Sequence, residues 1–330
     1  MSAIFFSQRL LHNVRAAEYN GVIATRLMRA ALLLACFLYW IVGSQAIYQA
    51  PGTEESPTHC TVFHHMVKSA GSTIKRILNQ SAKAHGQPRL AMCAFPMREK
   101  YTPGCLSGLH RSEVIIGHGE LIRQPLDKLG RRCEYFTIMR DPIERLVSAF
   151  FYCPTDHDLQ NRPSEWCGDS GTPELATERL LDFARNEWRN QAFRQMSFGT
   201  YCPPSIFCKE SPVGPYSSLN EPGSLQLLQD VQNILSTYTA VGIMEFWDLS
   251  MDLLNARIKT SVRDWRAATS NVGIVNRGAT SGLRSEVLEW AYKSVDIRST
   301  LEADLILYNH ALGLFKNQTA TSLGVSWVQE

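Results

Sequence analysis

Beyond residue 60, apolar and polar positions divide the chain into short strand-like runs that alternate with longer helix-like segments. The strand-like runs are apolar almost throughout and rich in residues that favour strands, and they begin at Thr61, Ser112, Cys133 and Thr239. The helix-like segments repeat apolar residues every three or four positions, and they begin near Gly71, Asp141, Thr172, Ser224 and Phe246, with further ones near the C-terminus. Polar, loop-rich stretches cover 86–111, 199–219 and 270–282. This alternation predicts an α/β fold, a P-loop-like parallel sheet flanked by helices.

Two of the helix starts carry local capping signals. Asp141 is placed as an N-cap, Pro142 stands at the first helical position, and Glu144 is placed for a capping box. A second helix starts at Thr172-Pro173, and its apolar positions extend it to about Gln195.

An uncharged stretch of 19 residues, 30–48, is long enough to cross a bilayer as a helix. Four arginines precede it and two glutamates follow it, so the positive-inside rule predicts a type II anchor with the bulk of the chain in the lumen. A cleaved signal peptide is the alternative, but the 29 residues before this stretch are longer than a usual n-region, and no clear A-x-A cleavage site follows it. The predicted organisation is a cytosolic tail at 1–29, a signal-anchor at 30–48, a stem at 49–59 and a single lumenal domain at 60–330.

The composition excludes some classes of protein and fits this placement. A chain of 330 residues that is 45% hydrophobic can bury a large core, and a formal charge of +2 excludes a broadly basic nucleic-acid binder. Eight of the nine cysteines lie beyond the predicted anchor, as expected in an oxidising lumen. The favoured disulfides close short loops and pair Cys202 with Cys208 and Cys153 with Cys167, whereas Cys133, at the start of a strand, is the better candidate for a free buried thiol.

The sequence offers two glycosylation sequons and no metal motif. The sequons begin at Asn79 and Asn317, and a lumenal domain would expose them to modification. The chain has no CxxC pair, and the adjacent His64 and His65 point to opposite faces of a strand, so we expect no metal site.

The segment from Thr61 to Leu78 predicts a strand, a glycine turn and a helix, which together form a cradle for an anion. Such a turn gathers unpaired backbone N–H groups and the positive end of the helix dipole around one point. The cradle would consist of Lys68, Ser69, Ala70, Gly71, Ser72 and Thr73. The ATPase pattern G-x-x-x-x-G-K-[ST] fails, because Lys68 precedes Gly71 by three residues.

A second anion-binding group is predicted where the strand that begins at Cys133 ends. This strand delivers Arg140 to the carboxyl edge of the sheet, and Ser148 follows two helical turns after the cap at Asp141. A guanidinium and a hydroxyl can thus converge on one phosphate. The alternative is a capped helix whose arginine pairs with a carboxylate.

Both motifs resemble those of sulfotransferases that use 3′-phosphoadenosine 5′-phosphosulfate (PAPS). H-x-x-K-S-A-G-S-T resembles the 5′-phosphosulfate loop, and R-D-P-x-x-R-x-x-S, from Arg140 to Ser148, resembles the 3′-phosphate motif. Within that superfamily the chain looks most like the Golgi heparan sulfate 2-O- and uronyl 2-O-sulfotransferases. That likeness rests on Gly117-His118, on the loop from Cys202 to Cys208, on V-G-x-x-E from Val241 and on L-Y-x-x-A-x-x-x-F from Leu307. It departs at Ile116, where the family often has the first histidine of H-G-H.

The resemblance implies a Golgi enzyme that transfers a sulfuryl group from PAPS to a hydroxyl of a polysaccharide, such as the 2-O position of a uronic acid, without a metal. Lys68 would contact the bridging region of the donor, and Gly71, Ser72 and Thr73 would hold its 5′-phosphate, with Ser69 and Ala70 in the same donor-binding loop. Arg140 and Ser148 would hold its 3′-phosphate. Arg277, in the loop 270–282, would close over the nucleotide. His118 would be the catalytic base, with Glu120 and His65 as the alternatives. Arg194 and Gln195 are candidates for lining the acceptor groove.

Two other functions remain open from the sequence. A catalytically silent glycan-binding membrane protein could keep the same fold, and the substitution of Ile116 for a histidine motivates that alternative. A P-loop kinase is disfavoured by the position of Lys68 and by the lack of a clear acidic metal-binding strand end.

Overall fold

Five parallel strands form the sheet at the centre of the described part of the chain. The computed structural model describes residues 59–84, 91–93, 114–117, 131–151, 172–198, 219–220, 223–260, 262, 264–272 and 282–327. The strands are β1 (His59–His64), β2 (Ala91–Cys93), β3 (Val114–Gly117), β4 (Arg132–Met139) and β5 (Ala240–Ile243). Their order is β2-β3-β1-β4-β5, and each described pair of neighbours is parallel. The predicted α/β fold with a parallel sheet is confirmed.

The central strand β1 is apolar because helices cover both faces of the sheet. Val62 and Phe63, whose side chains point to opposite faces, are 2% and 0% exposed. Strand β1 lies between β3 and β4, with Phe63 opposite Ile116 on one side and Phe136 on the other. Since the strands are parallel, their carboxyl ends meet at one edge, and the segments that follow β1, β3, β4 and β5 all leave the sheet there.

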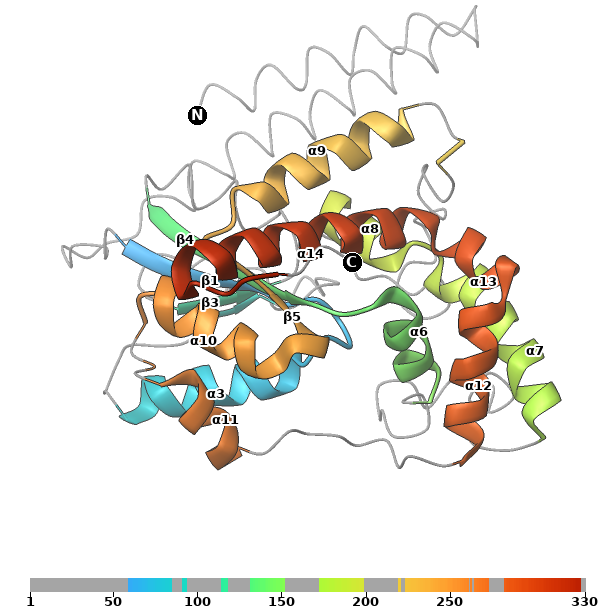
Figure 1. Cartoon of the computed structure of the whole chain (residues 1–330), viewed down its shortest axis with the longest axis horizontal. Helices are drawn as coiled ribbons and strands as arrows, with labels where there is room; N and C mark the ends of the chain where they lie inside the picture. Colours follow the sequence, from blue (N-terminus) through green and yellow to red (C-terminus); the bar gives the residue numbers. More distant parts are fainter. Residues whose placement is uncertain are drawn as a thin grey trace, which may run out of the picture. The chain divides into compact units, whose positions relative to one another are not determined.

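Helices pack on both faces of this sheet. Figure 1 shows α3, α10 and α11 on one face and α9 and α14 on the other. A second apolar cluster joins α6, α7, α12 and α13 beyond the carboxyl ends of the strands, and it is separate from the cluster around the sheet. The helices are α3 (Gly71–Ala84), α6 (Pro142–Phe150), α7 (Pro173–Phe183), α8 (Gln191–Phe198), α9 (Ser224–Ser236), α10 (Trp247–Arg257), α11 (Trp265–Val272), α12 (Gly282–Lys293), α13 (Val295–Thr300) and α14 (Glu302–Leu323).

The helix that begins at Asp141 has the predicted cap but not the predicted capping box. Asp141 Oδ1 accepts hydrogen bonds from the N–H groups of Ile143 and Glu144 at 2.9 and 3.0 Å, so the N-cap is confirmed. Glu144 does not reach back to the amide of Asp141, because its carboxylate pairs with Arg140 at 2.7 Å. Glu245, just after β5, accepts that amide at 2.9 Å instead.

Three further predictions about the elements were wrong. The helix expected over 172–195 ends at Phe183, passes through a π-helical turn (Ala184–Trp188) and resumes as α8 after Asn190, whose φ is 43°. Strand β2, only three residues long, lies in the stretch predicted as loop. Helix α11 also went unrecognised, and it extends into the polar stretch that begins at Ser270.

One disulfide lies within the described residues and was not expected. Cys60 on β1 is bonded to Cys133 on β4, and these two residues are opposite each other in the parallel ladder. Cys133, which the sequence made the better candidate for a free buried thiol, is therefore bonded instead. The expected pairs Cys202–Cys208 and Cys153–Cys167 lie outside the described residues.

The predicted anchor, 30–48, also lies outside the described residues, which all belong to one compact unit, Ser56–Glu330. Within the described part of the chain, no helix combines the length and the apolar character needed to span a bilayer. Both sequon asparagines, Asn79 on α3 and Asn317 on α14, are exposed.

Candidate functional site

The loop between β1 and α3 has a backbone conformation that non-glycine residues seldom adopt. Lys68 and Ala70 have φ angles of 66° and 57°, in the left-handed region. Such conformations cost on the order of 1–3 kcal/mol each and persist where the surroundings impose them, often at ligand-binding loops. Between them, Ser69 N–H donates to the carbonyl of Met66 at 3.3 Å. The loop is therefore a folded turn, as the sequence predicted.

The N-terminus of α3 presents backbone donors at the end of this loop. The carbonyl of Ala70 accepts the amides of Thr73 and Ile74 at 3.0 and 3.2 Å, which starts the helix. No described residue accepts a hydrogen bond from the N–H groups of Gly71 and Ser72. Together with the positive end of a 14-residue helix, these donors favour an anion.

Position 71 has no room for a side chain, because the imidazole ring of His65 lies against it. A Cβ at this position would overlap the Cδ2 and Nε2 atoms of the His65 imidazole. The ring of His65 therefore lies directly over the first residue of α3, and it also contacts Phe63 at 5.8 Å between centroids. This packing places His65, one of the alternative bases, beside the loop.

The hydroxyl of Ser69, in this loop, is buried without a hydrogen-bond partner among the described residues. The residue is 0% exposed. A buried hydroxyl without a partner is costly, so it points to a missing acceptor. A phosphate oxygen held by the α3 N-terminus would supply one. Of the two hydroxyls that follow, Thr73 is buried and Ser72 is exposed.

Arg140 meets this loop from the neighbouring strand. It follows directly on β4, and its Nη1 donates to the carbonyl of Lys68 over 3.5 Å, while its Nη2 pairs with Glu144 at 2.7 Å. The structure thus brings the two predicted anion-binding motifs, 72 residues apart in the sequence, to one point at the carboxyl edge. The pairing of Arg140 with a carboxylate, which the sequence left open as an alternative, is also present.

A second arginine near Arg140 was missed by sequence reasoning. The pKa of Arg284, on α12, is lowered mainly by burial and next by the positive charge of Arg140, while the charge of Glu144 raises it. On α6, Glu144 and the half-buried Ser148 lie four residues apart and therefore share one face of the helix. The only sequence signal for Arg284 is its place in the row Arg284, Leu288, Tyr292, which shares one face of α12.

The carboxylates close to these arginines are engaged by protein donors. Asp141 caps α6, and Glu245 accepts both the amide of Asp141 and the hydroxyl of Tyr308, the latter at 3.0 Å. The pKa of Tyr308 is raised mainly by burial and next by the negative charge of Glu245, so this hydroxyl stays protonated and donates. The pKa of Tyr292 is also raised, mainly by burial and next by the negative charge of Asp141. These donors offset negative charge that would otherwise oppose an anion.

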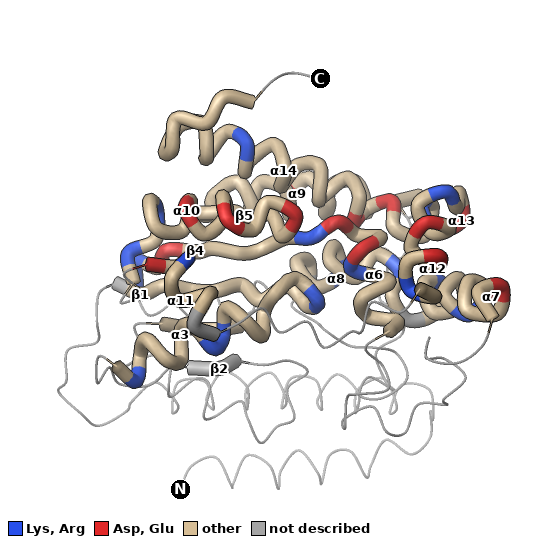
Figure 2. The backbone as a smooth tube through the Cα atoms, turned by 60° about the horizontal axis from the view of Figure 1, so that its bottom comes forward, with Lys and Arg blue, Asp and Glu red and all other residues tan. Residues whose placement is uncertain are grey.

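Positive and negative residues are otherwise interspersed along the described elements, as Figure 2 shows. Within the described residues, positive charge is therefore not gathered into one extended field, in line with the small net charge.

Several predicted site residues lie elsewhere or outside the described residues. His118, Glu120 and Arg277 are outside them, although Gly117, which precedes His118, ends β3 beside β1. Ile116 is 2% exposed and belongs to the apolar core. Gln195 is 0% exposed and bonded to the backbone carbonyl of His65, so its placement at an acceptor groove was wrong. Its partner in that prediction, Arg194, is half-buried on the same helix.

Comparison with known proteins agrees with the two motifs. No curated protein matches the chain. Residues 55–211 match the model of a family described as the sulfotransferase family. The match includes the loop 68–73, strand β4 and helix α6 with Arg140 and Ser148. Through this stretch the chain is similar to the sulfotransferases, and the match supports a sulfotransferase family for it.

Proposed function

We propose that this protein is a PAPS-dependent sulfotransferase that modifies a hydroxyl of a glycan, such as the 2-O position of a uronic acid. The contact between Arg140 and Lys68 carries the proposal, because it unites two phosphate-binding motifs at one sheet edge. The family match over residues 55–211 supports the reaction class.

The donor fits the residues at this edge. The amides of Gly71 and Ser72 and the hydroxyl of Ser69 would hold the 5′-phosphate, and they are the groups for which the described residues supply no acceptor. The guanidinium of Arg140 and the hydroxyl of Ser148 would hold the 3′-phosphate, since a guanidinium grips phosphate oxygens through paired N–H donors.

The chemistry requires an in-line displacement at sulfur. A bond forms between the acceptor oxygen and sulfur, the bond between sulfur and the bridging phosphate oxygen breaks, and the acceptor proton passes to a base. The ammonium of Lys68 and the α3 N-terminus neutralise charge that develops on the departing phosphate. His118, the next residue in the sequence after Gly117 at the end of β3, is the proposed base.

The acceptor and the location are proposed from the sequence. A single-pass type II anchor at 30–48 would place the domain in the Golgi lumen, where acidic polysaccharides are modified. Fluorescence microscopy of the tagged full-length chain with Golgi and endoplasmic reticulum markers tests the location, and a protease-protection assay tests the topology.

The reaction is tested with the purified full-length chain, ³⁵S-labelled PAPS and a panel of acidic and neutral polysaccharides. We expect transfer to at least one uronic-acid-containing glycan and loss of transfer in Lys68→Ala. Calorimetric titration with 3′-phosphoadenosine 5′-phosphate (PAP) measures donor-site binding separately. Binding of PAP without transfer to any glycan would favour the silent glycan-binding protein, and stronger competition by ATP than by PAPS would favour a kinase.

A further inference from the structure

Gln195 on α8 is hydrogen-bonded to the backbone on both sides of Met66, where the candidate donor loop begins. Its Nε2 donates to the carbonyl of His65 at 2.7 Å, and its Oε1 accepts from the N–H of Val67 over 3.5 Å. The side chain is 0% exposed. The side-chain amide of Gln195 thus bonds the carbonyl of His65 and the N–H of Val67, and the left-handed Lys68 follows directly.

Gln195 is in turn held by a network of buried polar side chains on helices α8, α6 and α14. Gln191, one turn earlier on α8, donates from Nε2 to Gln195 Oε1 at 3.1 Å. Gln191 Oε1 accepts a hydrogen bond from Arg145 on α6. Arg145 forms an ion pair with Asp304 on α14 at 2.6 Å, and both side chains are buried, at 2% and 0% exposure.

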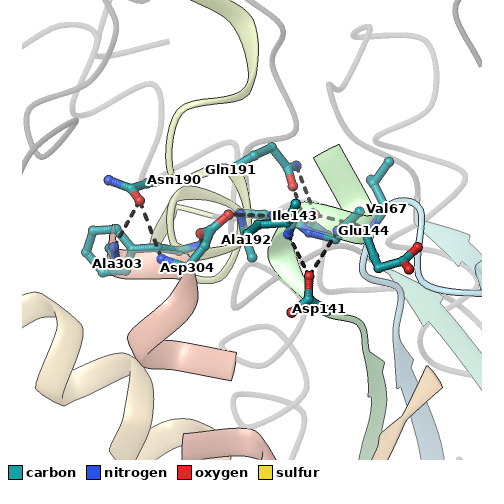
Figure 3. Close-up of polar contacts among 12 residues, drawn as sticks. Val67, Asp141, Ile143, Glu144, Asn190, Gln191, Ala192, Ala303 and Asp304 are labelled. Atoms are coloured by element: carbon teal, nitrogen blue, oxygen red, sulfur yellow. Dashed lines mark hydrogen bonds and ion pairs between the residues drawn. The ribbon is translucent and has the colours of Figure 1, made fainter. Parts of the chain in front are cut away.

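Asp304 and Asn190 fix the position of α8 by capping two helices reciprocally. Asp304 accepts the amides of Ala192 and Phe193, at the start of α8, at 3.1 and 2.8 Å. Asn190 Oδ1 accepts the amides of Ala303 and Asp304, at the start of α14, at 3.0 and 3.4 Å. Figure 3 shows both side chains pointing toward the other helix's first turn. Each helix end thereby obtains the acceptor that its own sequence does not provide.

We propose that Gln195 is a positioning residue: the buried network fixes its side chain, and its two backbone hydrogen bonds then hold the candidate donor loop in its conformation. Without Gln195, the partly buried His65 carbonyl and Val67 amide would each lose one hydrogen bond. The two left-handed residues that follow would then lose part of the support that imposes their conformation. The network ends on the loop backbone, so its effect on the donor is exerted through the conformation of Lys68 and Ser69. The assignment of this loop to PAPS rests on the proposed function.

The chain supplies a closely matched control for Gln195. Gln318 on α14 is also a buried glutamine bonded to two backbone groups, accepting from Val241 N–H at 2.9 Å and donating to the Tyr238 carbonyl at 3.2 Å. Tyr238 precedes β5, so these bonds lie toward the amino ends of the strands, away from the loop. Gln195→Met and Gln318→Met therefore remove the same two kinds of backbone bond with the same change in side chain, and Gln195→Met also removes the bond from Gln191.

Two measurements on the full-length chain distinguish a positioning role from a structural one. Hydrogen–deuterium exchange without ligand follows the amides of residues 65–70, and calorimetric titration with PAP gives the dissociation constant. We expect Gln195→Met to accelerate exchange in the loop and to weaken PAP binding, each by about tenfold or more. Gln318→Met should leave both unchanged while lowering the melting temperature to a similar extent. Should Gln195→Met fail to fold, Gln195→Asn, which keeps the amide and shortens the reach, undergoes the same two measurements with the same expectation.

Equal loop exchange and equal PAP affinity in the Gln195 and Gln318 variants would overturn the proposal. Failure of the proposed function would look different: the wild-type chain would not bind PAP at all. The exchange comparison would still decide whether Gln195 holds the loop.

Discussion

Replacing Asp304 by asparagine should destabilise the protein far more than removal of an exposed aspartate from a similar ion pair. Asp304 accepts three hydrogen bonds, from Arg145 Nη2 at 2.6 Å and from the amides of Ala192 and Phe193 at 3.1 and 2.8 Å. Asparagine keeps the shape but has one acceptor oxygen, and its NH₂ group would face other donors. The guanidinium of Arg145, 2% exposed, would then be buried without its counter-charge.

The expected loss is about 3–5 kcal/mol in the free energy of unfolding, the range found when one partner of a buried ion pair is removed. Because domains are stable by only about 5–15 kcal/mol, this is a large fraction of the total. The control is Asp296→Asn, which removes the carboxylate of the Arg185–Asp296 pair at 3.3 Å. These side chains are 51% and 62% exposed, so its contribution should be about 1 kcal/mol or less.

Urea unfolding of the full-length chain, followed by circular dichroism and by tryptophan fluorescence, measures both variants. Trp188 is a nearby reporter, since the guanidinium carbon of Arg145 lies 5.6 Å from the centroid of its ring. The double variant Arg145→Met/Asp304→Asn should be more stable than Asp304→Asn alone, because it removes the buried positive charge that has lost the carboxylate of Asp304. If Asp304→Asn costs no more than Asp296→Asn, the buried pair does not stabilise the fold as argued.

Three further variants test the candidate site. Ser69→Ala should leave the melting temperature unchanged or higher, because the hydroxyl has no partner among the described residues, yet weaken PAP binding by about tenfold in calorimetry; unchanged affinity would remove Ser69 from the site. Gly71→Ala should lower the free energy of unfolding by about 1–3 kcal/mol in urea titrations, because its Cβ overlaps the ring of His65; full stability would show that the ring moves without cost. His118→Ala should lower the rate of transfer from labelled PAPS by about 10²–10⁴-fold with PAP binding retained, and wild-type turnover would exclude His118 as the base.

Features set by neighbouring residues could be predicted from the sequence. The cap at Asp141 follows from an acidic residue before Pro142, and the strands follow from short apolar runs. The meeting of Lys68 and Arg140 followed from a single topological rule, that parallel strands share a carboxyl edge.

Features set by distant residues could not be predicted in this way. The helix expected to run to Gln195 is interrupted at Asn190, and the acceptors for the first amides of α8 come from Asp304, more than a hundred residues away. Glu144 was a reasonable capping-box residue, but Arg140 competes for its carboxylate and Glu245 takes its place. Pairing of Cys60 with Cys133 requires the strand order, which short apolar runs do not specify.

The candidate site depends on residues that lie beyond the stretch matched by the sulfotransferase family. That stretch ends at residue 211 and contains Asp141 and Arg145, but their partners Glu245 and Asp304 lie after it. A chain that ended there would lack the carboxylate that pairs with Arg145 and would leave the first amides of α8 without Asp304 as an acceptor. Because α8 also carries Gln195 to the loop, the geometry around Lys68 cannot be a property of the matched stretch alone. The segment that follows β5 and helix α14 therefore support the candidate anion cradle, although neither is predicted to contact the proposed donor.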